Sequence, residues 1–202
     1  MKSNFRLTLL LILLTDALCA QTYITNVSVA DVVQHRWLHN QTVTISHELI
    51  TDIRPAQQAK IPANAAIVDG EGKYLIPGLI DAHIHFSQTG GLYTRPDAID
   101  LRKYKPYQEE IDWAHDHMEE VLRRYLQNGI TTVMDVGTTI NFLKHRDAFK
   151  DATYAPSIYM SGPLLTTYEP AALSNLGDDG PFSLVKTVED GLKMVQQQLQ
   201  YH

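Results

Sequence analysis

Apolar and polar residues alternate in short runs along the first part of the chain. These runs are rich in β-branched side chains, and a two-residue period with such side chains predicts β-strands. A turn signal, Gly70-Glu71-Gly72, closes the last run. We expect strands over residues 23–29, 42–46, 49–55 and 65–69. Residues 21–72 are therefore predicted to form a small unit built from strands.

Beyond residue 72 the pattern changes to longer apolar runs that alternate with helical periodicity. Apolar residues between Ile111 and Leu126 recur at three- and four-residue steps, which is typical of an amphipathic helix. A later segment opens with Thr187 and Asp190, at the spacing of a capping box. We expect strands over residues 74–80, 130–136 and 156–163, and helices over residues 109–128, 139–150 and 187–201. Strands that alternate with helices predict a parallel sheet with covered faces, and so an α/β fold.

Two long segments, residues 86–106 and 164–181, contain Gly and Pro and have no clear periodicity. Long loops in compact domains are usually either functional or disordered. In the first, Tyr93, Arg95 and Asp97 are candidates for substrate contact or lid closure, and an ordinary solvated loop is the alternative.

The first twenty residues have the order of an export signal, and we leave them out of the fold. Lys2 and Arg6 are followed by an apolar core over residues 7–14 and by small residues up to Ala20. The core is too short to span a bilayer, although a short N-terminal anchor is the alternative. We expect cleavage after Ala20 and a periplasmic or extracellular protein. A lipoprotein anchored through Cys19 is less favoured, because Asp16 and Leu18 fit that signal poorly.

Composition and charge limit which partners and which cysteine chemistry the chain can have. The chain has 202 residues and a formal net charge of −6, and no basic stripe is visible, so a nucleic-acid partner is not expected. The one cysteine is Cys19. Cleavage after Ala20 would leave neither disulfides nor thiolate metal ligands in the mature chain.

Two His-x-His pairs offer candidate metal ligands. His83 and His85 end an apolar run, and in a strand they would point to the same face, where two imidazoles can share one divalent ion. The bland alternative is a polar strand end. His115 and His117 fall in a predicted helix, where residues two positions apart are separated by about 200° around the axis. We therefore expect two surface histidines that cannot bind the same metal ion.

The run from Leu75 to His85, an apolar strand with Pro-Gly and then Asp-x-His-x-His, resembles the first barrel strand of the amidohydrolase superfamily. The resemblance is to the imidazolonepropionase and Xaa-Pro dipeptidase-like branch. Residues 129–137, Gly-Ile-Thr-Thr-Val-x-Asp-x-Gly, are similar to the family's second barrel strand. This resemblance makes Asp135 a candidate pocket residue, with a turn or cap role as the alternative.

The resemblance implies a small β-sandwich segment over residues 21–72. The first three βα units of a TIM-type (β/α)8 barrel would follow over residues 73–202. It implies a divalent metal, usually zinc, held by His83 and His85, and a metal-activated water that attacks C–N bonds in a small-molecule or dipeptide-like substrate. The other ligands and the general base would come from later strands. Homologues often carry Gly-Gly-His near residues 167–170, and this chain does not, so no pocket residue is carried over there.

A complete barrel of this type needs eight βα units, and the chain contains three. We therefore expect it to be the N-terminal portion of a longer protein and to be inactive by itself. Further copies of the chain are an expected partner, and no transmembrane helix is expected after residue 20. Two alternatives remain open. One is a non-catalytic exported fragment or binding module that keeps the front half of the fold. The other is a β-plus-α domain whose His-x-His is accidental.

Overall fold

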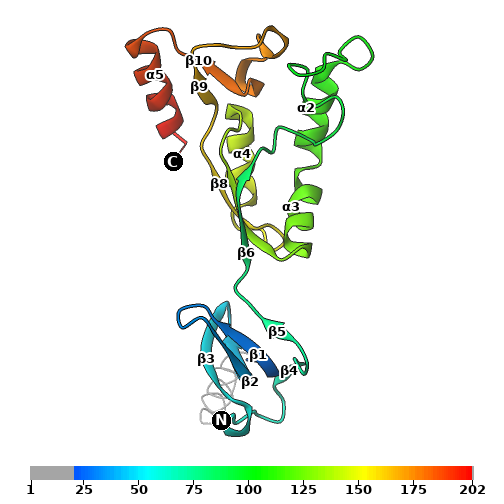
Figure 1. Cartoon of the computed structure of the whole chain (residues 1–202), viewed down its shortest axis with the longest axis vertical. Coiled ribbons are helices and arrows are strands. Elements are labelled where there is room, and N and C mark those ends of the chain that lie inside the picture. The colour runs from blue at the N-terminus through cyan, green and yellow to red at the C-terminus, as the bar shows by residue number, and fades with distance from the viewer. Residues whose placement is uncertain (1–20, 202) are drawn as a thin grey trace, which may run out of the picture. The chain divides into compact units, whose positions relative to one another are not determined.

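The computed structural model describes residues 21–201 (Figure 1). The expected export signal and Cys19 lie outside the described residues. The chain is a mixed α/β protein that divides into two compact units, the first ending at Pro77 and the second beginning at Gly78. Among residues 21–201, no helix is both long and apolar enough to cross a bilayer.

The described residues of the first unit form one sheet of five strands. These are β1 (Thr22–Asp31), β2 (Arg36–Ser46), β3 (Leu49–Pro55), β4 (Ala66–Asp69) and β5 (Tyr74–Leu75). The order is β3-β2-β1-β4, with β5 also paired to β1. Strands β1, β2 and β3 are antiparallel neighbours, whereas β4 and β5 run parallel to β1. A short 3-10 helix, η2 (Ala56–Gln58), follows β3. Val27, Val29 and Val43 form the buried core.

The described residues of the first unit form a single sheet, so the β-sandwich segment expected over residues 21–72 stays a prediction. One expectation for this region needs correction. The apolar run 74–80 is not one strand. Its first two residues pair with β1 as β5, and a new strand begins only at Leu79.

The second unit contains a parallel sheet with the order β6-β7-β8, as the alternating pattern predicts. Its strands are β6 (Leu79–Ile84), β7 (Ile130–Asp135) and β8 (Ser157–Met160). Its helices are α2 (Tyr107–Asp116), α3 (Met118–Gln127), α4 (Ile140–Phe149) and α5 (Val188–Leu199). The capping box predicted for the last helix is present, because Thr187 and Asp190 each accept the other's backbone N–H.

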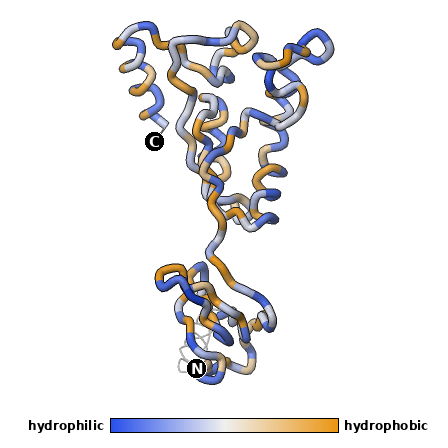
Figure 2. Tube along the Cα trace, in the orientation of Figure 1, coloured by the Kyte–Doolittle hydropathy of each residue, from blue (hydrophilic) through white to orange (hydrophobic). Residues whose placement is uncertain are grey.

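One face of this sheet is buried against helices α2, α3 and α4. Ile84 and Val133 pack there with Met118, Leu122 and Phe142. Met134, the neighbour of fully buried Val133 on β7, is 42% exposed. Orange and blue segments alternate along the helices in Figure 2, as expected where one side of a helix packs and the other is solvated.

The predicted helix 109–128 is broken into α2 and α3. His117 separates them with φ −104° and ψ 13°, outside helical geometry. The predicted loop 164–181 is also more ordered than expected. Strands β9 (Leu164–Thr166) and β10 (Phe182–Leu184) pair in parallel. The short helices η3 (Ala171–Leu173) and η4 (Gly177–Asp179) lie between them in sequence.

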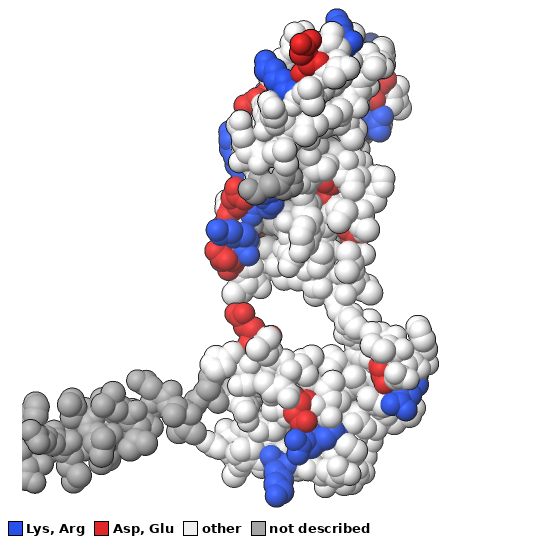
Figure 3. Space-filling view, turned by 90° about the vertical axis from the view of Figure 1, so that its left-hand side faces the viewer, with Lys and Arg blue, Asp and Glu red and all other residues white. Residues whose placement is uncertain are grey.

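Charged side chains of both signs are interspersed on the faces shown in Figure 3. Many are paired locally. Arg123 meets Glu119 at 2.8 Å, one helical turn away, and Arg124 pairs with Glu120 in the same way. Such exposed pairs contribute little to stability, so they mainly keep the helix surface solvated.

Candidate metal-binding site

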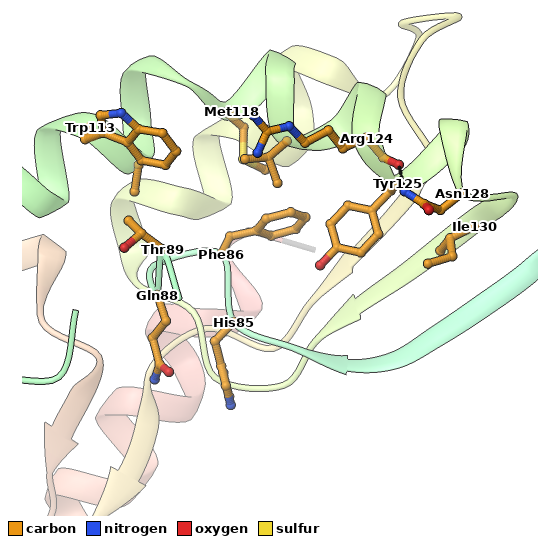
Figure 4. A pocket seen from close by; sticks show the side chains of 12 residues that line it. His85, Phe86, Gln88, Thr89, Trp113, Met118, Arg124, Tyr125, Asn128 and Ile130 are labelled. Carbon is orange, nitrogen blue, oxygen red and sulfur yellow. Dashed lines mark hydrogen bonds between the residues drawn. The ribbon is translucent and has the colours of Figure 1, made fainter. Parts of the chain in front are cut away.

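The end of β6 places the two histidines of the first pair side by side. Ile84 and Phe86 belong to the buried core beneath the helices, and strand alternation turns His83 and His85 to the other side. Their ring centroids are 5.3 Å apart, at an interplanar angle of 88°. In Figure 4, His85 points away from Phe86 and Tyr125. The shared face that the sequence predicts is therefore present.

Asp135 lies at the end of β7, next to His85, with an exposed fraction of 0%. Its Oδ2 accepts the backbone N–H of Phe86 at 2.9 Å, and its Oδ1 accepts that of Gly137 at 3.1 Å. Burial raises the pKa of this carboxyl group, and the two backbone hydrogen bonds oppose that shift. These contacts tie the end of β7 to the residue that follows His85, and they occupy both carboxylate oxygens.

His85 is held between Asp135 and Gly137. Its Nδ1 is buried and has no hydrogen-bond partner among residues 21–201, and it lies 3.7 Å from Asp135 Oδ1. A Cβ atom added at Gly137 would lie 3.1 Å from His85 Cε1 and 3.0 Å from the Leu164 side chain. The absence of a side chain at residue 137 therefore leaves room for the ring.

This arrangement fits two ligands of a divalent metal. A metal-binding histidine usually donates its second ring N–H to a carboxylate or a carbonyl, and His85 Nδ1 faces the Asp135 carboxylate at 3.7 Å, beyond hydrogen-bond distance. His83 is exposed, and its ring makes no hydrogen bond to any residue that the structure describes. Within residues 21–201 no group of three His, Cys, Asp or Glu side chains could enclose a metal ion. The described residues therefore contain no complete ligand set of this kind.

A cavity of about 180 Å³ opens beside His85 and brings a second candidate, Arg95, to the same place. Arg95 donates to both carboxylate oxygens of Asp97, at 2.8 and 2.7 Å. This hydrogen-bonded pair lowers the pKa of Asp97. Tyr107 also lines the cavity, and burial raises the pKa of its phenol. Tyr107 opens helix α2 and belongs to no recognisable motif, so no pattern in the sequence marks it as a candidate.

The other candidate in that loop lies elsewhere. Tyr93 is half-buried, and its ring centroid lies 5.5 Å from the Lys105 ammonium nitrogen. It does not line the cavity that contains Arg95. Its contact with a substrate stays a prediction.

A second cavity, of about 340 Å³, lies on the helix side of the strand end. Phe86, Met118, Tyr125 and the stem of Arg124 line it, as Figure 4 shows. Its walls mix apolar side chains with polar ones such as Gln88 and Thr89, and the His85 ring is directed away from them. Because the His85 ring points away from this cavity, we take the smaller one as the candidate site.

The second histidine pair differs from its expected role in one respect. His117 stacks on Trp113 at 4.3 Å, and the two rings of the pair make no described contact with each other, as their spacing predicts. His115, however, is partly buried, with 23% of its side chain exposed. It hydrogen-bonds His145 and Asp179, partners that lie far away in sequence and that periodicity could not reveal.

Parallel strands that alternate with helices, with paired histidines at the carboxyl end of the first strand, define the class: a mixed α/β protein with a candidate metal site at the strand ends. Comparison with known proteins gives the family. Residues 74–197 match the model of the amidohydrolase family. The chain belongs to the amidohydrolase family, as the motif around His83 indicates.

Individual proteins are similar to parts of this chain in sequence or in structure. Guanine deaminase from Escherichia coli is 29% identical over 85 residues, which cover 39% of this chain and 19% of the deaminase. The structure of a prolidase complexed with N-methylphosphonate-L-proline superposes with a TM-score of 0.64 at 21% identity, over 90% of this chain and 44% of the prolidase. A Xaa-Pro dipeptidase with bound methionine gives 0.63 at 18% identity, over 90% and 45%. The chain spans less than half the length of each of these proteins.

Proposed function

We propose that this chain is the N-terminal part of a divalent-metal-dependent hydrolase that cleaves C–N bonds in amides, cyclic amides or dipeptide-like substrates. One observation carries the proposal. Two imidazoles converge at the end of β6, and the inner one faces a buried carboxylate across 3.7 Å. Family membership supports the reaction class, because the matched relatives include a deaminase and a prolidase.

In this proposal His83 and His85 are ligands of the metal, with zinc the expected ion. Imidazole nitrogen is a favourable ligand for zinc, and catalytic sites use three protein ligands, so at least one more would come from elsewhere in the full-length protein. When bound, the ion lowers the pKa of a water molecule and polarises the carbonyl group of the substrate. Asp135 orients His85 and fixes the backbone of Phe86, and it does not touch the substrate.

Substrate recognition is assigned to the cavity beside His85. Arg95 uses two of its five N–H donors on Asp97, and three remain for an anionic group of the substrate. A dipeptide-like substrate has such a group in its carboxylate. Tyr107, on the wall of the same cavity, offers a hydroxyl group for a second polar contact.

The test is an activity assay of the full-length protein with Xaa-Pro dipeptides and cyclic amides, after metal removal and after zinc is restored. We expect hydrolysis that depends on added metal. Arg95→Ala should raise KM for dipeptides by about tenfold or more, the cost of one lost hydrogen bond to a charged group. Turnover that persists unchanged in the metal-free protein would contradict the proposal.

A further inference from the structure

Three side chains from three separate segments form a hydrogen-bonded chain away from the β6 histidines. His115 on α2 places Nδ1 at 2.7 Å from His145 Nε2 on α4. Its Nε2 lies 2.8 Å from Asp179 Oδ1, at the end of η4. The His115 ring also stacks on Phe142, with centroids 4.2 Å apart and an interplanar angle of 24°. Hydrogen bonds and stacking together fix this ring from several directions.

The partners determine where the protons are. A carboxylate can only accept, so the Nε2 of His115 donates to Asp179. The Nδ1 of a neutral His115 must then accept, and the Nε2 of His145 donates to it. Burial chiefly, and the neighbouring imidazole, lower the pKa of His145. This pair of tautomers satisfies both hydrogen bonds with neutral rings.

The chain of contacts ends on the wall of the cavity beside His85. Asp179 is followed by buried Gly180 and then by Pro181 and Phe182, both of which line that cavity. The carbonyl oxygen of Pro181 accepts the N–H of Leu164, another lining residue, at 2.9 Å. The anchor at Asp179 thus fixes the segment that closes one side of the cavity.

We propose that His115 is a positioning residue, which through Asp179 holds segment 171–184 in place as the substrate-facing wall of the His85 cavity. The inference rests on the proposed function, because it takes that cavity to be the substrate site. If the His115–Asp179 contact were purely structural, its loss would loosen the whole unit. If His115 positions the segment, loss of the contact loosens this segment alone and changes substrate binding.

The variants are His115→Ala and Asp179→Ala in the full-length protein. Asp179→Asn is the conservative change that keeps an acceptor oxygen. Asp178→Ala is the matched control, because Asp178 lies on the same 3-10 turn and is exposed. Hydrogen–deuterium exchange followed by mass spectrometry reports on segment 171–184, with α3 as the internal reference.

We expect exchange of segment 171–184 to rise by about tenfold or more in the two alanine variants, since each loses a hydrogen bond to a carboxylate. The asparagine variant should recover much of the protection, and Asp178→Ala should match the wild type. KM should rise in the alanine variants more than kcat falls. Unchanged exchange, equal loosening of α3, or local loosening with an unchanged KM would each overturn the proposal. Exchange does not depend on turnover, so an inactive wild-type protein would refute the proposed function separately.

Discussion

Asp135→Ala removes the acceptor that two buried backbone N–H groups share. In the wild type these groups belong to Phe86 and Gly137, at 2.9 and 3.1 Å from the carboxylate oxygens. A buried donor without a partner costs about 1–3 kcal/mol, so two such donors cost about 2–6 kcal/mol. The lost carboxylate was itself costly to bury, as its raised pKa indicates, and this offsets part of the loss. We expect the free energy of unfolding to fall by about 2–4 kcal/mol, a large share of the total for a domain.

Asp135→Asn is the companion change, because it keeps one acceptor oxygen and replaces the other with a donor. The free energy of unfolding should therefore fall by about half as much as in Asp135→Ala. Urea unfolding of the full-length protein, followed by circular dichroism, measures both variants against the wild type. If Asp135→Ala unfolds within about 0.5 kcal/mol of the wild type, the range of an ordinary surface change, the reasoning about these contacts is wrong.

Three further results are expected. Gly137→Ala should weaken metal binding, because the new Cβ would lie 3.1 Å from His85 Cε1 and would displace the ring. An unchanged metal affinity would contradict the inference that Gly137 leaves room for that ring. Because the pKa of His145 is lowered from its ordinary value of 6.5, the unfolded state binds more protons below that pH, and the free energy of unfolding should fall as pH decreases through it. This slope, read from urea midpoints across pH, should flatten in His145→Gln, and an identical slope would refute it. Thr187→Ala should cost α5 about 1 kcal/mol through its lost capping bond, with Thr187→Ser as the control, and equal urea midpoints for both variants would contradict this.

Local patterns predict much of the fold because they depend on neighbours in sequence. The alternation around Val27 and Val43 marks a half-buried sheet, and the spacing of Thr187 and Asp190 marks the start of α5. Strand alternation likewise predicts that His83 and His85 share a face. Each of these features needs only the period of the element that contains it.

Features that depend on distant partners could not be predicted in the same way. Periodicity continues through His117, so it does not reveal the break between α2 and α3. His115 looks like a surface residue on its own helix, and its hydrogen bonds come from residues 30 and 64 positions later. The same holds for Tyr107, whose place beside His85 depends on how α2 packs.

The most direct test of the account is the metal content of purified full-length variants, measured by mass spectrometry. His83→Ala and His85→Ala each remove one proposed ligand, and bound zinc should fall by about tenfold or more, since even changes behind the ligands typically cost that much. His117→Ala is the matched control, because its ring stacks on Trp113 and is no part of the proposed site. The account predicts metal loss in the first two variants and wild-type content in the third. Equal metal content in all three would contradict it.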